Sequence, residues 1–138
     1  MPKTPRHSGS GERDPNFSGP DVIVDFIFDA GLFFISIINI GDKPAFNVSV
    51  TFDKKIRGLA GTKEISALPL FKNIEFLAPG KKITTFLDRS ESYFGRKGPT
   101  KISANISYRD SKGTRHLVKI KHDLGIYREI GYVTRPVS

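Results

Sequence analysis

The sequence contains no Cys, no Trp and only one Met, at position 1. Without Cys, the chain can form no disulfide bridge, thiolate metal site or iron–sulfur cluster, and it has no cysteine nucleophile. It also lacks an apolar run suited to a secretory signal or a membrane span, because the most apolar stretch, residues 22–40, contains Asp25, Asp29 and Asn39. We therefore expect a soluble chain without a signal peptide or a transmembrane segment. The compartment stays open, since a domain with a sufficient core needs no disulfide anywhere.

No pattern typical of a catalytic or metal-binding site is complete. Residues 58–63 lack the spacing of a phosphate-binding loop, and the G-x-S-x-G pattern of serine hydrolases does not occur. His116 and His122 lie six residues apart on one expected strand. At roughly 3.3 Å per residue they are about 20 Å apart, too far to share a metal ion. We therefore expect a protein that is not an enzyme and that holds no metal and no cofactor.

The chain divides into one domain and two tails. Its 138 residues suit a single domain. Residues 1–20 are rich in Pro, Gly, Ser and charged residues and contain one aromatic residue, a composition that predicts a disordered N-terminal tail. We assign residues 21–132 to the domain and residues 133–138 to a C-terminal tail.

Apolar and polar residues alternate along much of the domain, which is typical of β-strands with one face in solvent. The alternation is clear in residues 21–29 and 101–109. Between residues 46 and 53, the even positions are apolar and the odd positions polar, so Phe46 is expected on the buried face. Residues 32–40 are apolar on both faces, which suits a central strand.

Turns and irregular stretches separate these strands. Residues 78–81 fit a type II turn, and residues 110–113 fit a hairpin turn before a return strand. We expect short strands in residues 65–71 and 74–77, and a loop over 91–100. The whole pattern predicts an all-β fold, an immunoglobulin-like antiparallel β-sandwich of seven to eight strands.

Two short motifs carry a resemblance to a known family. Residues 37–50, IINIGDKPAFNVSV, resemble the N-x-G-x-x-P/A-x-x-V-x-V signature of prokaryotic immunoglobulin-like domains. Residues 76–81, FLAPGK, resemble the turn that follows this signature in those domains. The most similar group is the CARDB-like domains, the cell-adhesion-related modules of bacteria, and the resemblance covers roughly residues 32–109. It implies a surface spacer or a binding module without catalytic activity.

Positive charge is concentrated in the C-terminal part of the chain. The formal charge is +8 for the whole chain, and residues 101–138 contribute +5 of it. The alternation places five basic residues on the polar faces of two paired strands, namely Lys101, Arg109, Arg115, Lys119 and Lys121. If both polar faces point outward, they form one basic sheet face that attracts phosphates or acidic protein surfaces. The alternative interpretation is that these charges serve only solubility.

Residues 91–100 offer a second candidate surface. Tyr93 and Phe94 lie beside Arg96 and Lys97 in the expected loop. Loops at the ends of a sandwich commonly carry binding residues, so we expect these four residues to contact a partner.

The leading functional hypothesis is a non-catalytic immunoglobulin-like module that binds another protein or acts as a spacer. The alternative is an anion-binding module whose basic face contacts nucleic acid or an acidic partner surface. Tyr108 falls on the apolar side of its strand, so no exposed aromatic residue is expected among the basic residues. A protein that binds single strands usually stacks bases on aromatic side chains, and this favours the first hypothesis. The oligomeric state stays open.

Overall fold

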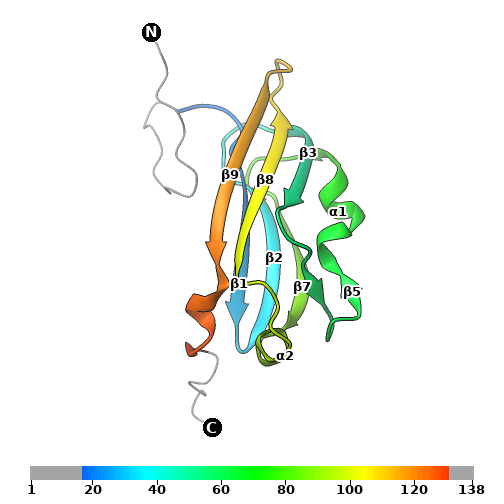
Figure 1. Ribbon diagram of the computed structural model, residues 1–138. Helices are drawn as coiled ribbons and strands as arrows, with labels where there is room; N and C mark the ends of the chain where they lie inside the picture. Colours follow the sequence, from blue (N-terminus) through cyan, green and yellow to red (C-terminus); the bar gives the residue numbers. More distant parts are fainter. Residues whose placement is uncertain (1–16, 131–138) are drawn as a thin grey trace.

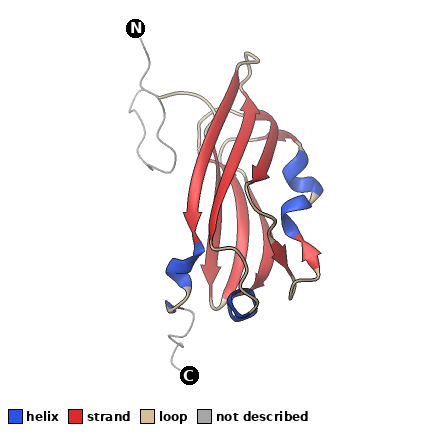
Figure 2. Ribbon diagram, in the orientation of Figure 1, coloured by secondary structure: helices blue, strands red, loops and turns tan. Residues whose placement is uncertain are grey.

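The computed structural model describes residues 17–130 (Figure 1). Two antiparallel sheets pack face to face, with short helices at the side and the lower end of the sandwich (Figure 2). The expected all-β sandwich is therefore confirmed. Residues 1–16 of the predicted N-terminal tail and all of the predicted C-terminal tail lie outside the described residues. Gly19 and Asp42 exchange hydrogen bonds, with Gly19 N donating to Asp42 Oδ1 over 2.7 Å, which connects the start of the described chain to the domain.

The first sheet has three strands in the order β1-β2-β7. These strands are β1 (Val22–Asp29), β2 (Leu32–Asn39) and β7 (Lys82–Arg89). β2 is central, as its apolar sequence predicted, and pairs with both neighbours along its length. Alternate residues point into the core, so that Val24 and Phe26 in β1 and Ile35 in β2 are at most 2% exposed.

The second sheet has four strands in the order β6-β3-β8-β9. These strands are β3 (Ala45–Phe52), β6 (Ile74–Leu77), β8 (Lys101–Arg109) and β9 (Arg115–Asp123). β8 and β9 form the predicted hairpin, in which Gly113 N donates to the Asp110 carbonyl over 2.9 Å and Gly113 has a φ of 84°. The short β6 and the nine-residue β9 are the two edges of this sheet.

A β-bulge in β3 makes one part of the alternation prediction wrong. Asn47 has a φ of 52°, and the pairing of β3 with β8 shifts between Phe46 and Ser49. The extra residue turns Phe46 to the outer face, opposite the exposed Arg109, while Ala45 fills the inner position with 0% exposure. Successive side chains of a strand point to opposite faces of the sheet. One inserted residue therefore exchanges the faces of all side chains on one side of the insertion.

The elements that connect the strands of the two sheets are short. They are β4 (Arg57–Gly58), β5 (Lys63–Glu64), the 3₁₀ helix η1 (Ile65–Ala67), α1 (Pro69–Lys72), α2 (Ser90–Gly95) and the 3₁₀ helix η2 (Leu124–Tyr127). The predicted strand over 65–71 is wrong, because η1 and α1 occupy it. Pro69 has no N–H for a sheet ladder, and its fixed φ suits the first position of a helix. No helix in residues 17–130 is long and apolar enough to cross a membrane.

Candidate partner-binding face

The structure brings the five predicted basic residues onto one outer face of the second sheet. Lys101 and Arg109 lie at the two ends of β8, and Arg115, Lys119 and Lys121 lie on β9. All five side chains are exposed, while every second residue of β8, from Ile102 to Tyr108, points into the core. We call this group the basic face, and its predicted outward orientation is confirmed.

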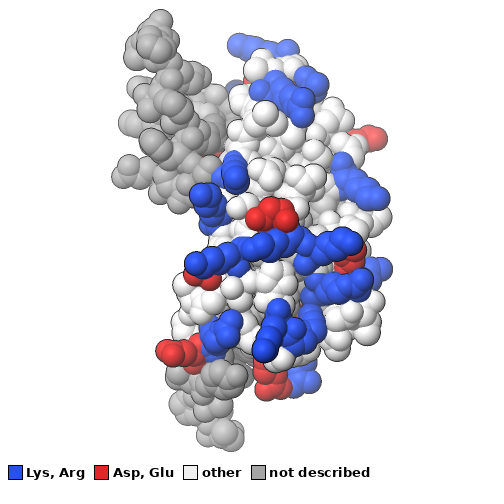
Figure 3. Space-filling model, in the orientation of Figure 1, with Lys and Arg blue, Asp and Glu red and all other residues white. Residues whose placement is uncertain are grey.

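The cross-strand register orders the basic face in rows. Arg109 pairs with Arg115, so two arginines lie on neighbouring strands at the hairpin end. Lys119 and Lys121 lie opposite Asn105 and Ser103, which are short polar side chains. Figure 3 shows Lys and Arg side chains spread over β8 and β9, with few acidic side chains between them. The result is a surface that carries cations and small polar groups, with one carboxylate, Asp123, opposite Lys101 at its lower end.

The arginines of the basic face are held by neutral oxygen acceptors. Arg109 Nη1 donates to the Gly113 carbonyl over 3.0 Å, and Arg115 Nε donates to Ser107 Oγ over 3.1 Å. Within residues 17–130, no carboxylate forms an ion pair with any residue of the basic face. Their charge is therefore not neutralised by the described part of the chain and is available to an anionic partner.

An apolar side chain lies within the basic face. Leu117 is opposite Ser107, between Arg115 and Lys119 on β9, and is 71% exposed. A large apolar residue so exposed among cations differs from an ordinary solvated strand, which keeps polar side chains on its outer face. This combination of apolar contact and surrounding charge is typical of a protein interface.

Sequence reasoning missed two aromatic residues at the far side of the same outer face. Phe46 on β3 pairs with Phe76 on β6, and their ring centroids are 5.5 Å apart. Phe76 is 57% exposed, and Phe46 lies directly opposite Arg109. The Asn47 bulge places Phe46 there, and strict alternation of apolar and polar residues carries no signal of a bulge.

A hydrogen bond between His116 and Asp110 fixes the hairpin end of the basic face. His116 Nε2 lies 3.0 Å from Asp110 Oδ2, and the His116 ring stacks on Tyr108 at a centroid distance of 5.2 Å. The hydrogen bond with His116 lowers the pKa of the Asp110 carboxyl below its ordinary value. Asp110 also accepts hydrogen bonds from the backbone N–H groups of Lys112 and Thr114. The turn that separates Arg109 from Arg115 is thus held in place by hydrogen bonds among its own residues.

The second surface predicted from the sequence is not formed. The expectation that Tyr93 and Phe94 are exposed is wrong, because they are 0% and 9% exposed. Both lie on α2, which replaces part of the expected loop, and both rings contact Phe33 of β2. Large aromatic rings at the end of a sandwich stabilise the fold more when they are buried against the core than when they are exposed to solvent. Lys97 is exposed, with a φ of 59°.

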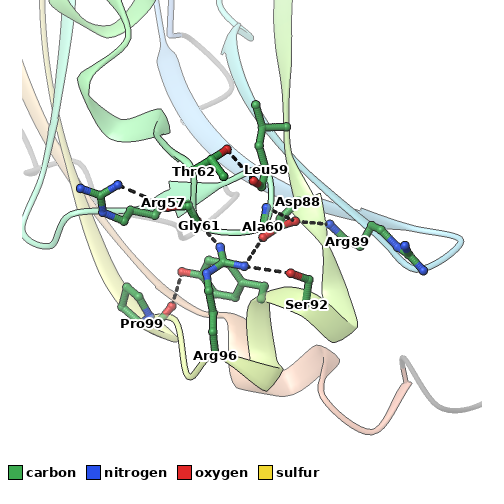
Figure 4. Close-up of polar contacts among 11 residues, drawn as sticks. Arg57, Leu59, Ala60, Gly61, Thr62, Asp88, Arg89, Ser92, Arg96 and Pro99 are labelled. Atoms are coloured by element: carbon green, nitrogen blue, oxygen red, sulfur yellow. Dashed lines mark hydrogen bonds and ion pairs between the residues drawn. The ribbon is translucent and has the colours of Figure 1, made fainter.

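Arg96, the fourth residue of that predicted surface, joins the chain segments at the lower end of the sandwich (Figure 4). Its guanidinium forms an ion pair with Asp88 of β7 and donates to the Arg57 carbonyl of β4. It also lies over the Tyr93 ring, 5.4 Å from the centroid. Tyr93 donates its hydroxyl hydrogen to the Pro99 carbonyl over 2.6 Å, and burial raises the pKa of the Tyr93 phenol. These contacts serve the fold and leave Arg96 little freedom to bind a partner.

No cluster suited to metal binding exists in the described part of the chain, where no three His, Asp or Glu side chains converge. A cleft of about 470 Å³ lies between β3 and α1 and is lined by Lys54, Lys55 and Lys72 among others. It is a surface groove, and its lysines extend the positive charge of this side of the molecule toward α1.

Comparisons with known proteins place the chain in one family. No curated protein and no solved structure matches it significantly. A family described as a domain of unknown function, DUF8453, matches residues 12–128, which include both sheets. The chain therefore belongs to the DUF8453 family.

Proposed function

We propose that this protein is a non-catalytic immunoglobulin-like binding module, and that its basic face binds an acidic surface on another protein. The observation that carries the proposal is the basic face itself. Five exposed cations lie on two paired strands without an ion-pair partner in residues 17–130, and Leu117 is exposed among them. Complementary charge would speed association with an acidic partner, and Leu117 would supply apolar contact.

Several features of the face favour a protein partner over nucleic acid. Within β8 and β9, the outward residues are polar, charged or aliphatic, so these strands offer no ring on which a base could stack. Both helices in residues 17–130 are too short to enter a DNA groove, since α1 has four residues and α2 has six. The resemblance to CARDB-like domains also supports a role in protein contacts.

A second candidate function is the binding of a single-stranded nucleic acid. Phe46 and Phe76 favour it, because they lie on the same outer face as Arg109 and Arg115 and form one row with them across four strands. Two rings beside two guanidinium groups could stack bases and bind phosphates. The rings contact each other, however, and lie at the opposite edge of the sheet from the lysines of β9.

The test compares two polyanions as probes on the full chain. Fluorescence anisotropy with a labelled poly-glutamate peptide and with labelled single-stranded DNA, at low and near-physiological salt, distinguishes the two functions. A variant with Arg115, Lys119 and Lys121 changed to Glu reverses the charge of the basic face. The matched control changes three exposed lysines that lie off β8 and β9, namely Lys43, Lys63 and Lys81, to Glu.

Each outcome decides between the candidates. Binding of poly-glutamate that persists at physiological salt, is lost in the basic-face variant and survives in the control supports the proposal. Tighter binding of DNA that falls steeply with salt and needs Phe46 and Phe76 supports the second candidate. If neither probe binds at physiological salt, or if both variants behave alike, the charges serve solubility and both candidates are wrong.

A further inference from the structure

The outer face of the first sheet, on the opposite side of the molecule from the basic face, carries a group of large apolar side chains. Its outward side chains are half-buried and include Ile23, Ile27, Phe34, Ile38 and Phe86. They line up across the strands, because Ile23 pairs with Ile38 and Phe34 pairs with both Ile27 and Phe86. The rings of Phe34 and Phe86 have centroids 5.6 Å apart. This face therefore carries two rows of branched and aromatic side chains, which we call the apolar patch. A polar row of Asp25, Ser36 and Thr84 lies between them, with Ser36 Oγ and Thr84 Oγ1 2.7 Å apart.

The sequence of β2 points to a cover over this patch. Phe33, Ile35 and Ile37 fill the core with 0% exposure, and Phe34 and Ile38 point the other way. Strands that are apolar on both faces are typical of sheets covered on both sides. The helices of the described chain lie at the side and the lower end of the sandwich (Figures 1 and 2). Residues 1–16 include only one large apolar side chain, Met1, so they offer little apolar area with which to cover the patch.

Charged residues border the patch with opposite signs on its two sides. β1 carries Asp25 and Asp29, both exposed, on this face. β7, at the other edge of the sheet, carries Lys82 and Arg89, also exposed. Asp29 and Arg89 belong to one row, because both pair with Leu32 of the central strand. The face is thus acidic along β1 and basic along β7, and the two apolar rows run between these edges.

We propose that this face binds a second copy of the same chain, as a symmetric dimer. A two-fold axis parallel to β2 places β1 of one copy over β7 of the other and keeps the rows aligned. Asp29 then lies over Arg89 of the other copy, and symmetry repeats this contact. Each apolar row meets the same row of the other copy, and Asp25 lies over Thr84 in the polar row between them. Such a contact is self-complementary and closes at two copies. A two-fold axis perpendicular to the strands would instead place like charges together.

The size of the face sets the expected affinity. Three strands about 4.8 Å apart with eight residues each at about 3.3 Å span roughly 14 Å by 26 Å. This is smaller than the interface of roughly 800 Å² per partner found in standard stable complexes. We therefore expect a dissociation constant in the micromolar range. The dimer leaves both basic faces on its outside, so it would present two copies of that surface.

Sedimentation velocity of the full chain, from about 1 µM to about 500 µM, tests the dimer. Single variants D29R and R89D place like charges together twice and should raise the dissociation constant at least tenfold, on the order expected for paired like charges at an interface. The double variant D29R/R89D exchanges the two signs and should restore the wild-type dimer. F34D should abolish the dimer by placing a charge in one of the apolar rows.

Control variants separate this face from general charge effects. E75R and K63D make the same kinds of charge reversal at exposed positions on β6 and β5 and should leave the dissociation constant unchanged. Circular dichroism melts show whether each variant is folded at the measurement temperature. A wild-type chain that is monomeric at about 500 µM overturns the proposal. So does a dimer that survives D29R, R89D and F34D, since it would use another surface.

Discussion

The side-chain amide of Asn39, in β2 of the first sheet, donates a hydrogen bond over 3.1 Å to the carbonyl of Leu77, in β6 of the second sheet. The same amide nitrogen donates to the Lys43 carbonyl, and Asn39 Oδ1 accepts from the N–H groups of Asp21 and Gly41. Asn39 is 0% exposed. Both donors and both acceptor positions of the amide are therefore used, and the N-x-G motif has a structural role in holding the two sheets together.

Replacing Asn39 should strongly destabilise the fold. Asn39→Ala leaves four backbone groups without their partner in a buried site, and we expect a loss of about 2–4 kcal/mol in the free energy of unfolding. Asn39→Asp keeps the two acceptor contacts and removes the two donations, so it should also destabilise. Urea denaturation measures both changes. Asn105→Ala, at an exposed position on β8, is the matched control, and equal effects at the two positions would contradict the role given to Asn39.

Gly41, the second fixed residue of that motif, is required by space. A Cβ atom at this position would lie 2.2 Å from the Gly19 carbonyl oxygen and 2.7 Å from Asp21 N. Both are backbone atoms, so Gly41→Ala must displace the segment before β1, and we expect it to cost about 1–3 kcal/mol of stability. Gly95→Ala, where a Cβ meets nothing within 4 Å, should not destabilise the protein in the same denaturation experiment.

The fold could be predicted from sequence where alternation is strict and turns have their usual residues. β1, β8 and the hairpin turn with Gly113 follow that rule, because one face of each strand packs against the core and the other meets solvent. The prediction failed where one residue interrupts the alternation of side chains or the hydrogen bonding between strands. Asn47 inserts a bulge that turns Phe46 outward, and Pro69 starts a helix in an apolar run that reads as a strand.

The basic face could be predicted for the same reason that the strands could. Both strands of the hairpin are regular, so the register alone places Arg109 beside Arg115. The burial of Tyr93 could not be predicted, since it depends on α2 folding back on β2 and on Gly98 leaving room beneath the ring. A Cβ at Gly98 would lie 2.7 Å from the Tyr93 ring. Contacts of this kind are tertiary and leave no period in the sequence.

Different substitutions of Asn47, the residue of the bulge, should change the stability of the protein by different amounts. The left-handed φ of 52° is tolerated by Asn and Gly, whereas a β-branched residue is strained there. We expect Asn47→Val to cost about 1–2 kcal/mol and Asn47→Gly to cost little. Thermal unfolding by circular dichroism compares the two variants. Equal melting temperatures for the two variants would contradict a left-handed residue at position 47.

The ion pair between Arg96 and Asp88 should contribute more to stability than a surface pair. The Asp88 side chain is 4% exposed and that of Arg96 is 27% exposed. Arg96→Ala leaves a buried carboxylate without its cation and frees the Arg57 carbonyl, so we expect a loss of about 2–3 kcal/mol. Glu91→Ala breaks the ion pair between Glu91 and Arg89. The side chains of Arg89 and Glu91 are 68% and 70% exposed, so this change should cost less than about 1 kcal/mol. Urea denaturation at low salt measures both, because urea does not screen ion pairs, and a larger loss for Glu91→Ala would contradict the ranking.

His122 should make stability depend on pH in the mildly acidic range. Its Nε2 donates to the Val24 carbonyl of β1 over 2.9 Å, and its ring packs edge-on against Phe26. Burial lowers the pKa of the His122 imidazole below its ordinary value. The unfolded chain therefore binds a proton at higher pH than the folded chain does. Stability is complete above an unfolded-state pKa of about 6.5 and falls as the pH drops toward the lower folded-state pKa, by at most about 1.4 kcal/mol per pH unit.

The variant that isolates this effect is His122→Gln, which keeps a donor near the Val24 carbonyl and cannot titrate. Urea denaturation of both proteins between pH 7.5 and pH 5 should show a steeper loss of stability for the wild type. His116 is present in both chains, so its contribution cancels in the difference between the two curves. The lowered pKa of Asp110 acts only at more acidic pH, where its protonation removes the contact with His116. Parallel curves over this range would mean that the pKa of His122 is the same in the folded and unfolded chains. Burial between the sheets would then not disfavour the charged ring.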